Sequence, residues 1–192
     1  MRLNDALITS FIYEDKEYDI DLTFDNVLDV YDYLGDKTLR EYEKTLICLD
    51  LLLGNGAYDE TKAVDLWNYI YESFIHIKSH EPIEYDRKGN PMPSKKGKQG
   101  KHMDLEVDAK YIYASFMQAY GINLFHEQGK MHWLEFQSLL TGLPSNTIMQ
   151  RIIEIRKWKP KKGDSKEHRK EMEELQRIYA LDDEDENGEV DE

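Results

Sequence analysis

Cysteine is almost absent from this sequence, because Cys48 is the single cysteine among 192 residues. One thiol cannot form an intrachain disulfide, so burial and hydrogen bonding have to hold the fold together, as in proteins of a reducing cytosol. Cys48 lies in an apolar helical pattern, and free cysteine commonly behaves as a small apolar residue. We therefore expect Cys48 in the core.

Long hydrophobic runs are also missing. No stretch approaches the roughly 20 apolar residues that a membrane-spanning helix needs. The first ten residues, MRLNDALITS, contain Asp5 and lack the apolar centre of a signal peptide. We therefore expect a protein that works where it is made, in the cytoplasm, without a membrane partner.

The motifs of common active sites are missing as well. Gly54-Asn55-Gly56 lacks the strand-then-helix context of a dinucleotide site, and no serine sits in a recognisable nucleophile elbow. Glu72, His76 and His80 share one helical face, but no further ligand motif accompanies them. The sequence thus predicts no enzyme, no cofactor and no metal site, and we interpret these three side chains as a solvated helix edge.

Positive charge is too little to balance the negative charge, because 25 lysine and arginine residues face 39 acidic ones and the net charge is −14. Such an acidic chain is repelled by nucleic acid and by anionic membranes at long range. The basic stretch Arg87–Lys101 has no interleaved aromatic side chains, which nucleic-acid sites usually contain. We therefore expect no nucleic-acid partner, and this stretch could instead meet an acidic protein surface, including that of another copy.

The apolar periodicity that is present predicts a mainly α-helical fold with a small N-terminal β-hairpin. Phe11–Tyr13 and Tyr18–Leu22 are short and β-prone, and Glu14–Glu17 between them predicts a four-residue turn. A lone hairpin is marginally stable, so it has to lie on helices or pair with another chain.

Three helices are predicted before residue 81. Each is recognised from apolar residues at helical spacing. The stripes are Val27, Val30, Tyr31 and Leu34, ending at Gly35; Leu39, Tyr42, Leu46, Leu49 and Leu53, ending at Gly54; and Val64, Trp67, Tyr71 and Phe74, with Asp59 as the N-terminal cap.

The periodicity divides the chain into four parts, which we interpret as one composite domain with appendages. Residues 1–80 hold the hairpin and the first helices, and residues 81–103 read as a flexible basic loop. Residues 104–181 form a C-terminal helical module, in which Asp104 opens a long helix that Gly121 ends. Residues 182–192 hold eight acidic residues and no basic one, which predicts a disordered tail.

The segment Met131–Trp158 contains the residues that we expect to form a binding surface or the core of that module. Gly142 and Pro144 should end a first helix, Ser145 should cap a second, and the ring of His132 should cap the first through the backbone rather than act in catalysis. The apolar residues concerned are Trp133, Phe136, Leu140, Ile152, Ile155 and Trp158.

The run Asp104–Leu124, followed by His132-Trp133 and Phe136, resembles a family of small tail-module proteins from phages of Gram-positive bacteria, which are regarded as tail assembly chaperones. The resemblance extends over roughly Phe11–Leu181 and carries no catalytic or ligand residues. It implies a partner, the long apolar tape-measure protein, which the chaperone would keep soluble while recruiting tail-tube subunits.

The resemblance also implies self-association during assembly, residence in the host cytoplasm and absence from the mature virion. The alternative is a minor structural protein that remains in the tail.

Overall fold

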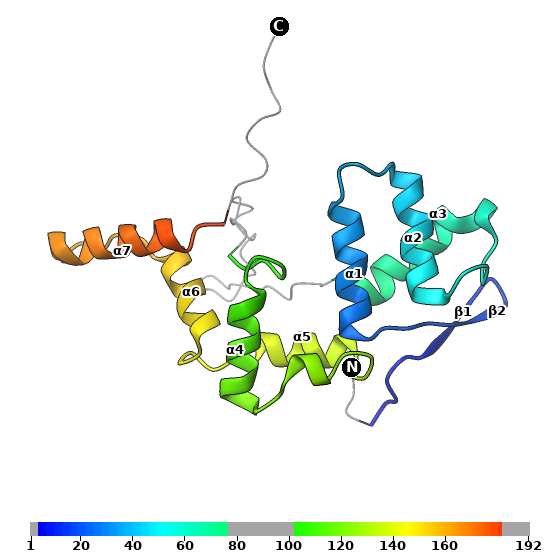
Figure 1. The fold of residues 1–192 in the computed structure, drawn as a ribbon, viewed down its shortest axis with the longest axis horizontal. Coiled ribbons are helices and arrows are strands. Elements are labelled where there is room, and N and C mark those ends of the chain that lie inside the picture. The colour runs from blue at the N-terminus through cyan, green and yellow to red at the C-terminus, as the bar shows by residue number, and fades with distance from the viewer. Residues whose placement is uncertain (1–3, 77–101, 182–192) are drawn as a thin grey trace, which may run out of the picture. The chain divides into compact units, whose positions relative to one another are not determined.

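The structure is a computed structural model, and it describes residues 4–76 and 102–181. These residues form seven α-helices and one two-stranded hairpin near the N-terminus (Figure 1), which confirms the predicted fold class. The predicted acidic tail and all but the last two residues of the predicted basic loop lie outside the described residues.

The chain forms two compact units that are interleaved along the sequence. Of the described residues, 4–76 and Leu124–Thr141 form unit 1, and 102–123 and 142–181 form unit 2. The segment around Trp133 therefore belongs with the N-terminal residues.

The hairpin opens unit 1. Strand β1 (Ser10–Tyr13) pairs antiparallel with β2 (Lys16–Asp19), and Tyr13 lies opposite Lys16. The turn therefore contains two residues, Glu14 and Asp15, with left-handed φ angles of 47° and 61°. This is the conformation that a two-residue hairpin turn of type I′ requires. The predicted four-residue turn is wrong because Lys16 and Glu17 already belong to β2.

The hairpin rests on helical residues of the same unit. The ring of Phe11 lies with its centroid 5.7 Å from that of Tyr69 and 5.3 Å from that of Phe74. Lys16 donates a hydrogen bond of 2.7 Å to the carbonyl of Ala57. These contacts supply the support that an isolated hairpin lacks.

Helices α1 (Phe24–Gly35) and α2 (Glu41–Leu53) pack against each other. The stripe predicted for α1 is confirmed at Val27 and Val30, which are fully buried. The face predicted for α2 is wrong at Tyr42, which is 48% exposed. Leucine occurs all around α2, so periodicity could not select the buried face, which contains Lys44, Thr45, Cys48, Leu49 and Leu52.

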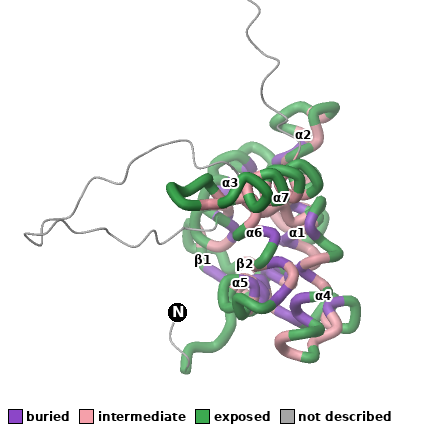
Figure 2. The backbone as a smooth tube through the Cα atoms, turned by 90° about the vertical axis from the view of Figure 1, so that its left-hand side faces the viewer, coloured by how far each residue is buried: buried purple, intermediate pink, exposed green. Residues whose placement is uncertain are grey.

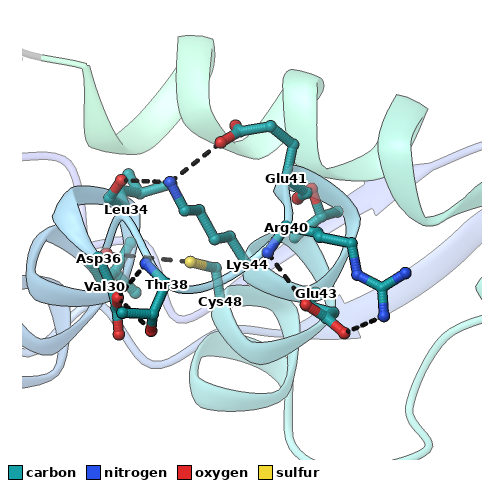
Figure 3. Close-up of polar contacts among 10 residues, drawn as sticks. Val30, Leu34, Asp36, Thr38, Arg40, Glu41, Glu43, Lys44 and Cys48 are labelled. Carbon is teal, nitrogen blue, oxygen red and sulfur yellow. Dashed lines mark hydrogen bonds and ion pairs between the residues drawn. The ribbon is translucent and has the colours of Figure 1, made fainter.

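A buried lysine joins these two helices (Figure 3). The Nζ of Lys44 donates a hydrogen bond of 3.1 Å to the carbonyl of Leu34 and lies 2.9 Å from a carboxylate oxygen of Glu41. The last carbonyls of a helix have no partner within the helix, so Lys44 satisfies one of those of α1. Lys44 is thus a structural cap rather than a reactive amine.

Cys48 lies on the same buried side of α2, as predicted. Its Sγ is 3.9 Å from the carbonyl oxygen of Val30, and the residue is fully buried. Burial raises the pKa of the Cys48 thiol to about 12. The thiol therefore stays protonated at neutral pH and is a poor nucleophile.

Helix α3 (Ala63–Ile70) lies between the 3₁₀ turn η1 (Glu60–Lys62) and the π-helical turn η2 (Tyr71–Ile75). Asp59 accepts a hydrogen bond of 2.9 Å from the N–H of Thr61, so it caps η1 rather than α3 itself. Val64 was expected on the buried face but is 48% exposed. A π-helical turn contains one residue more than an α-helical turn. Ile70 and Ile75, which are five residues apart, are therefore both buried.

Unit 1 is completed by η3 (Leu124–His126) and α5 (Trp133–Thr141). A short antiparallel bridge connects the start of α5 to the residues that precede α1. The N–H of Trp133 donates to the carbonyl of Leu22 at 2.7 Å, and the N–H of Phe24 donates to the carbonyl of Met131 at 2.9 Å. Helix α5 ends directly before Gly142, as predicted.

Unit 2 contains α4 (Ala109–Tyr120), α6 (Ile148–Lys157) and α7 (Lys166–Ile178). Asp104 opens an irregular turn before α4, because its carboxylate accepts hydrogen bonds from the N–H groups of Glu106 and Val107. Gly121 ends α4 with a left-handed φ of 67°, as predicted.

The predicted cap of α6 is wrong. Its N-cap is Thr147 rather than Ser145. The backbone N–H and the hydroxyl of Thr147 both donate to the carbonyl of Pro144, at 3.0 and 2.7 Å. Ser145 therefore lies inside a tight turn that precedes the helix.

Among the described residues, no helix is both long enough and apolar enough to cross a membrane.

Candidate partner-binding surfaces

Six residues were predicted to form a partner-binding surface or the core of the C-terminal module, and the structure separates them by burial. Four are buried: Trp133, Phe136, Leu140 and Ile152. Ile155 and Trp158 are half-buried. The buried four serve packing, so only the last two lie where a partner can touch them.

Trp133 and Phe136 belong to the core of unit 1, and their predicted place in the core of the C-terminal module is wrong. Phe136 stacks on Phe24 of α1 with 5.0 Å between ring centroids. The indole Nε1–H of Trp133 donates a hydrogen bond of 3.3 Å to the carbonyl of Ile75, which also accepts one from the hydroxyl of Tyr31. Trp133 thus ties together α5, α1 and the end of η2.

His132 caps α5, as predicted. Its Nδ1 accepts a hydrogen bond of 3.1 Å from the N–H of Leu134, and its own N–H donates to the carboxylate of Glu135 at 3.0 Å. The Nε2 lies 3.2 Å from the carbonyl of Ile8. A carbonyl can only accept, so these partners make Nε2 the donor and Nδ1 the acceptor. Both ring nitrogens are therefore engaged in structure rather than catalysis.

The predicted helix edge with Glu72 and His76 is described only in part, because His80 lies outside the described residues. The Nδ1 of His76 lies 3.5 Å from a carboxylate oxygen of Glu72. In the parts of the chain that the structure describes, no three His, Cys, Asp or Glu side chains gather closely enough to hold a metal ion.

Sequence reasoning missed the charged centre of unit 2. Arg156 of α6 donates two hydrogen bonds, of 2.6 and 2.8 Å, to the carboxylate of Asp108 at the start of α4. It also donates to the backbone carbonyls of Tyr179, at 2.6 Å, and His102, at 3.0 Å. One guanidinium group therefore holds the start of α4 and the end of α7. Apolar periodicity carries no signal for such a pair.

A second polar contact joins α4 to α6. The hydroxyl of Ser115 accepts a hydrogen bond of 3.1 Å from the N–H of Met149 and donates one of 2.7 Å to the carbonyl of Tyr111. Ser115 thereby satisfies one of the first N–H groups of α6, which have no partner within that helix. These contacts position α6 and, with it, Ile155 and Trp158.

Helix α7 contacts α6 and has no buried residue, as the green and pink colouring of its backbone in Figure 2 shows. The half-buried residues of α7 and its end form one stripe. The amide of Gln176 donates hydrogen bonds of 2.9 Å to the carbonyls of both Ile155 and Trp158 at the end of α6. The rings of Trp158 and His168 meet edge to face with their centroids 6.0 Å apart. The half-buried residues of the stripe are Arg169, Met172, Leu175, Gln176 and Tyr179.

We name these two helices and the link between them the α6–α7 surface. It is formed by the half-buried apolar residues Ile155, Trp158, Met172 and Leu175 and the exposed lysines Lys157, Lys159, Lys161, Lys162, Lys166 and Lys170. The pKa of nearby His102 is lowered, first by desolvation and then by the charges of Lys157, Arg156 and Lys159. The two helices and their link carry ten basic and six acidic residues, and the acidic ones are Glu154, Asp164, Glu167, Glu171, Glu173 and Glu174. Apolar contact area with this positive excess suits a partner with an apolar and acidic face.

Comparison with known protein families gives a match over most of the chain. Residues 3–181 match the model of the family described as Bacteriophage Gp15 protein. None of the curated proteins matches the chain, and neither does any solved structure.

Proposed function

The chain belongs to the Bacteriophage Gp15 protein family and is thus a phage protein of a structural or assembly-related kind, and we propose that it is a tail assembly chaperone. In this role it binds the tape-measure protein, keeps it soluble and helps to recruit tail-tube subunits. It acts as a binding protein rather than an enzyme, in the host cytoplasm, and leaves before the virion is complete.

The observation that carries this proposal is the exposure of α7. An amphipathic helix of 13 residues with no buried side chain gains little stability from its own unit. Its half-buried Met172 and Leu175 leave apolar area that a second helix can cover. Helix-in-groove recognition uses such apolar contacts at successive turns.

The positive excess of the α6–α7 surface supports the same function. A tape-measure segment that is apolar on one side and acidic on another would match both the apolar residues and the lysines. The remaining chain is strongly acidic, and a high net charge keeps a complex with an apolar partner in solution.

The decisive experiment is co-expression with the tape-measure protein encoded by the same phage. We expect a higher soluble yield of the tape measure and a complex that survives size-exclusion chromatography. Trp158→Ala should weaken the complex, because it removes the largest side chain of the α6–α7 surface. Val64→Ala, a truncation of an exposed residue of unit 1, is the matched control.

Two outcomes would count against the proposal. If the tape measure is equally soluble alone and no complex forms, the chain is not its chaperone. If the protein is found in purified virions at a fixed number of copies, it is a minor structural protein of the tail.

A further inference from the structure

Strand β1 has one edge that β2 does not cover. In an antiparallel hairpin with a two-residue turn, the residues that flank the turn exchange hydrogen bonds, and every second pair does the same. Tyr13–Lys16 and Phe11–Tyr18 are such pairs, and the 2.9 Å bond from the N–H of Ile20 to the carbonyl of Thr9 continues the alternation.

The backbone groups of Ser10 and Ile12 therefore point away from β2. Within the described ranges, no backbone hydrogen bond from outside the hairpin reaches either residue.

Both ends of this edge are closed. The carbonyl of Ile8 already accepts the hydrogen bond from Nε2 of His132. At the other end the chain enters the turn at Glu14, whose φ of 47° is incompatible with a strand. The open edge is thus confined to Ser10–Ile12.

The solvent-facing side of β1 itself carries no charged side chain, and the hydroxyl of Ser10 donates a hydrogen bond of 3.1 Å to the carboxylate of Glu17 on β2. Side chains alternate along a strand, so Ile8, Ser10 and Ile12 share one face. Ile12 is 70% exposed and Ile8 is 41% exposed. Residues 6–13 contain no charged side chain. Proteins usually protect exposed edge strands with charges, proline, bulges or a very short strand, and β1 has only its length of four residues as protection.

We propose that β1 pairs with β1 of a second copy of this chain, antiparallel and related by a two-fold axis at Phe11. Ser10 of each copy then lies opposite Ile12 of the other copy. Each of these pairs exchanges both backbone hydrogen bonds. The two hairpins join into one continuous sheet, and this pairing is independent of the proposed chaperone function.

The neighbouring registers are less favourable. If Ile12 lay opposite Ile12 of the other copy, Ser10 would lie opposite Glu14, which is in the turn. If Ser10 lay opposite Ser10 of the other copy, the pairing would need the carbonyl of Ile8, which already accepts a hydrogen bond from His132. The axis at Phe11 uses every open backbone group and disturbs neither end.

Charge and side-chain contacts favour a second copy as the occupant. Two chains of net charge −14 repel each other, so they meet best through β1, which carries no charge and keeps the carboxylates of Glu17 and Asp19 one strand away from the other copy. A pairing through β2 would instead bring Glu17 and Asp19 of both copies together. In the proposed register, Ile12 of one copy lies diagonal to both Ile12 and Ile8 of the other, within reach of contact.

The test is sedimentation velocity of the full chain from micromolar to millimolar concentration. We expect a reversible dimer and slower hydrogen exchange at the amides of Ser10 and Ile12 as concentration rises. Ile12→Lys places a charge from each copy in the new sheet and should abolish the dimer. Ile178→Lys makes the same change at a residue that is 66% exposed on α7 and should leave it intact.

Protection of the Ile20 amide verifies that the hairpin of the Ile12→Lys variant is folded. The inference is overturned if the chain stays monomeric throughout, or if the two lysine variants have the same effect. It is also overturned if the Ser10 and Ile12 amides become protected only when a different protein is added, since the edge would then take a foreign strand.

Discussion

Asp108 and Arg156 form a buried bidentate ion pair across unit 2, with nitrogen–oxygen distances of 2.6 and 2.8 Å. The Asp108 residue is fully buried, and the Arg156 side chain is 7% exposed. The same carboxylate accepts a hydrogen bond of 3.0 Å from the N–H of Asp104. Charges buried in this way are tolerated because their hydrogen bonds are satisfied on both sides.

Arg156→Lys should destabilise the protein although the positive charge remains. A lysine cannot bond the carboxylate in two places and also reach the carbonyls of Tyr179 and His102. Breaking a buried pair by removing one partner costs about 3–5 kcal/mol, and we expect a value toward the lower end because the charge is retained. Urea unfolding measures this, with Lys157→Ala, a change at the exposed neighbouring residue, as control. Equal midpoints for the two variants would contradict the clamp role of Arg156.

Trp133 should contribute more to stability than Trp158. Trp133 is 1% exposed, and truncating a buried aromatic to alanine costs about 3–5 kcal/mol, whereas Trp158 is only half-buried. Trp133→Phe keeps most of the packing but loses the bond to the carbonyl of Ile75, so we expect a loss of about 1 kcal/mol. Thermal unfolding should rank Trp133→Ala as the least stable of three variants, below both Trp133→Phe and Trp158→Ala. A small stability loss in Trp133→Ala, together with a large loss of partner binding, would place Trp133 on a docking surface instead.

His132 should act on stability through its cap. His132→Ala leaves the N–H of Leu134 without its acceptor, which costs about 1 kcal/mol. His132→Asn should recover most of this loss, because asparagine is a strong N-cap residue with a shorter reach. Chemical denaturation of the three proteins distinguishes the two contacts of the ring. An asparagine variant as unstable as the alanine variant would show that the bond to the carbonyl of Ile8 matters more than the cap.

His102 should make unit 2 less stable in mild acid. Its pKa is lowered from 6.5 by desolvation and by the neighbouring positive charges, so the unfolded chain binds the proton more tightly than the folded one. Stability from this residue is therefore complete above the unfolded pKa and falls as pH drops through about 6.5. His102→Gln keeps the backbone carbonyl that Arg156 binds but removes the titration.

The measurement compares the unfolding free energy of His102→Gln with that of the original chain as pH falls from about 8 to about 5. The original chain should lose more stability over this range than the variant. Parallel profiles would show that the histidine does not titrate differently in the two states.

Much of the secondary structure was predictable because its signals are local. The stripe of α1, the break after α5, the left-handed Gly121 and the cap at His132 each depend on residues a few positions apart. The hairpin was predicted for the same reason. Its turn length was not, because Glu14-Asp15 is not a sequence that normally favours two successive left-handed residues.

The candidate surface was predictable only in part. Ile155 of α6 and Trp158 at the end of that helix are half-buried and belong to the α6–α7 surface. Trp133 and Phe136 are buried in the core of unit 1 instead. Spacing identifies an apolar face without telling whether another element of the same chain covers it.

The sequence by itself determined where helices and strands form, because caps, glycines and apolar periods act through the backbone nearby. Tertiary structure alone decided which faces are buried and which segments share a unit. Helix α2 is apolar on several sides, so only its neighbours select Cys48 and Leu52 over Tyr42. Trp133 packs with α1 rather than with the helices next to it in sequence. Asp108 and Arg156 can be buried only together, because each charge needs the other in a medium that water does not reach.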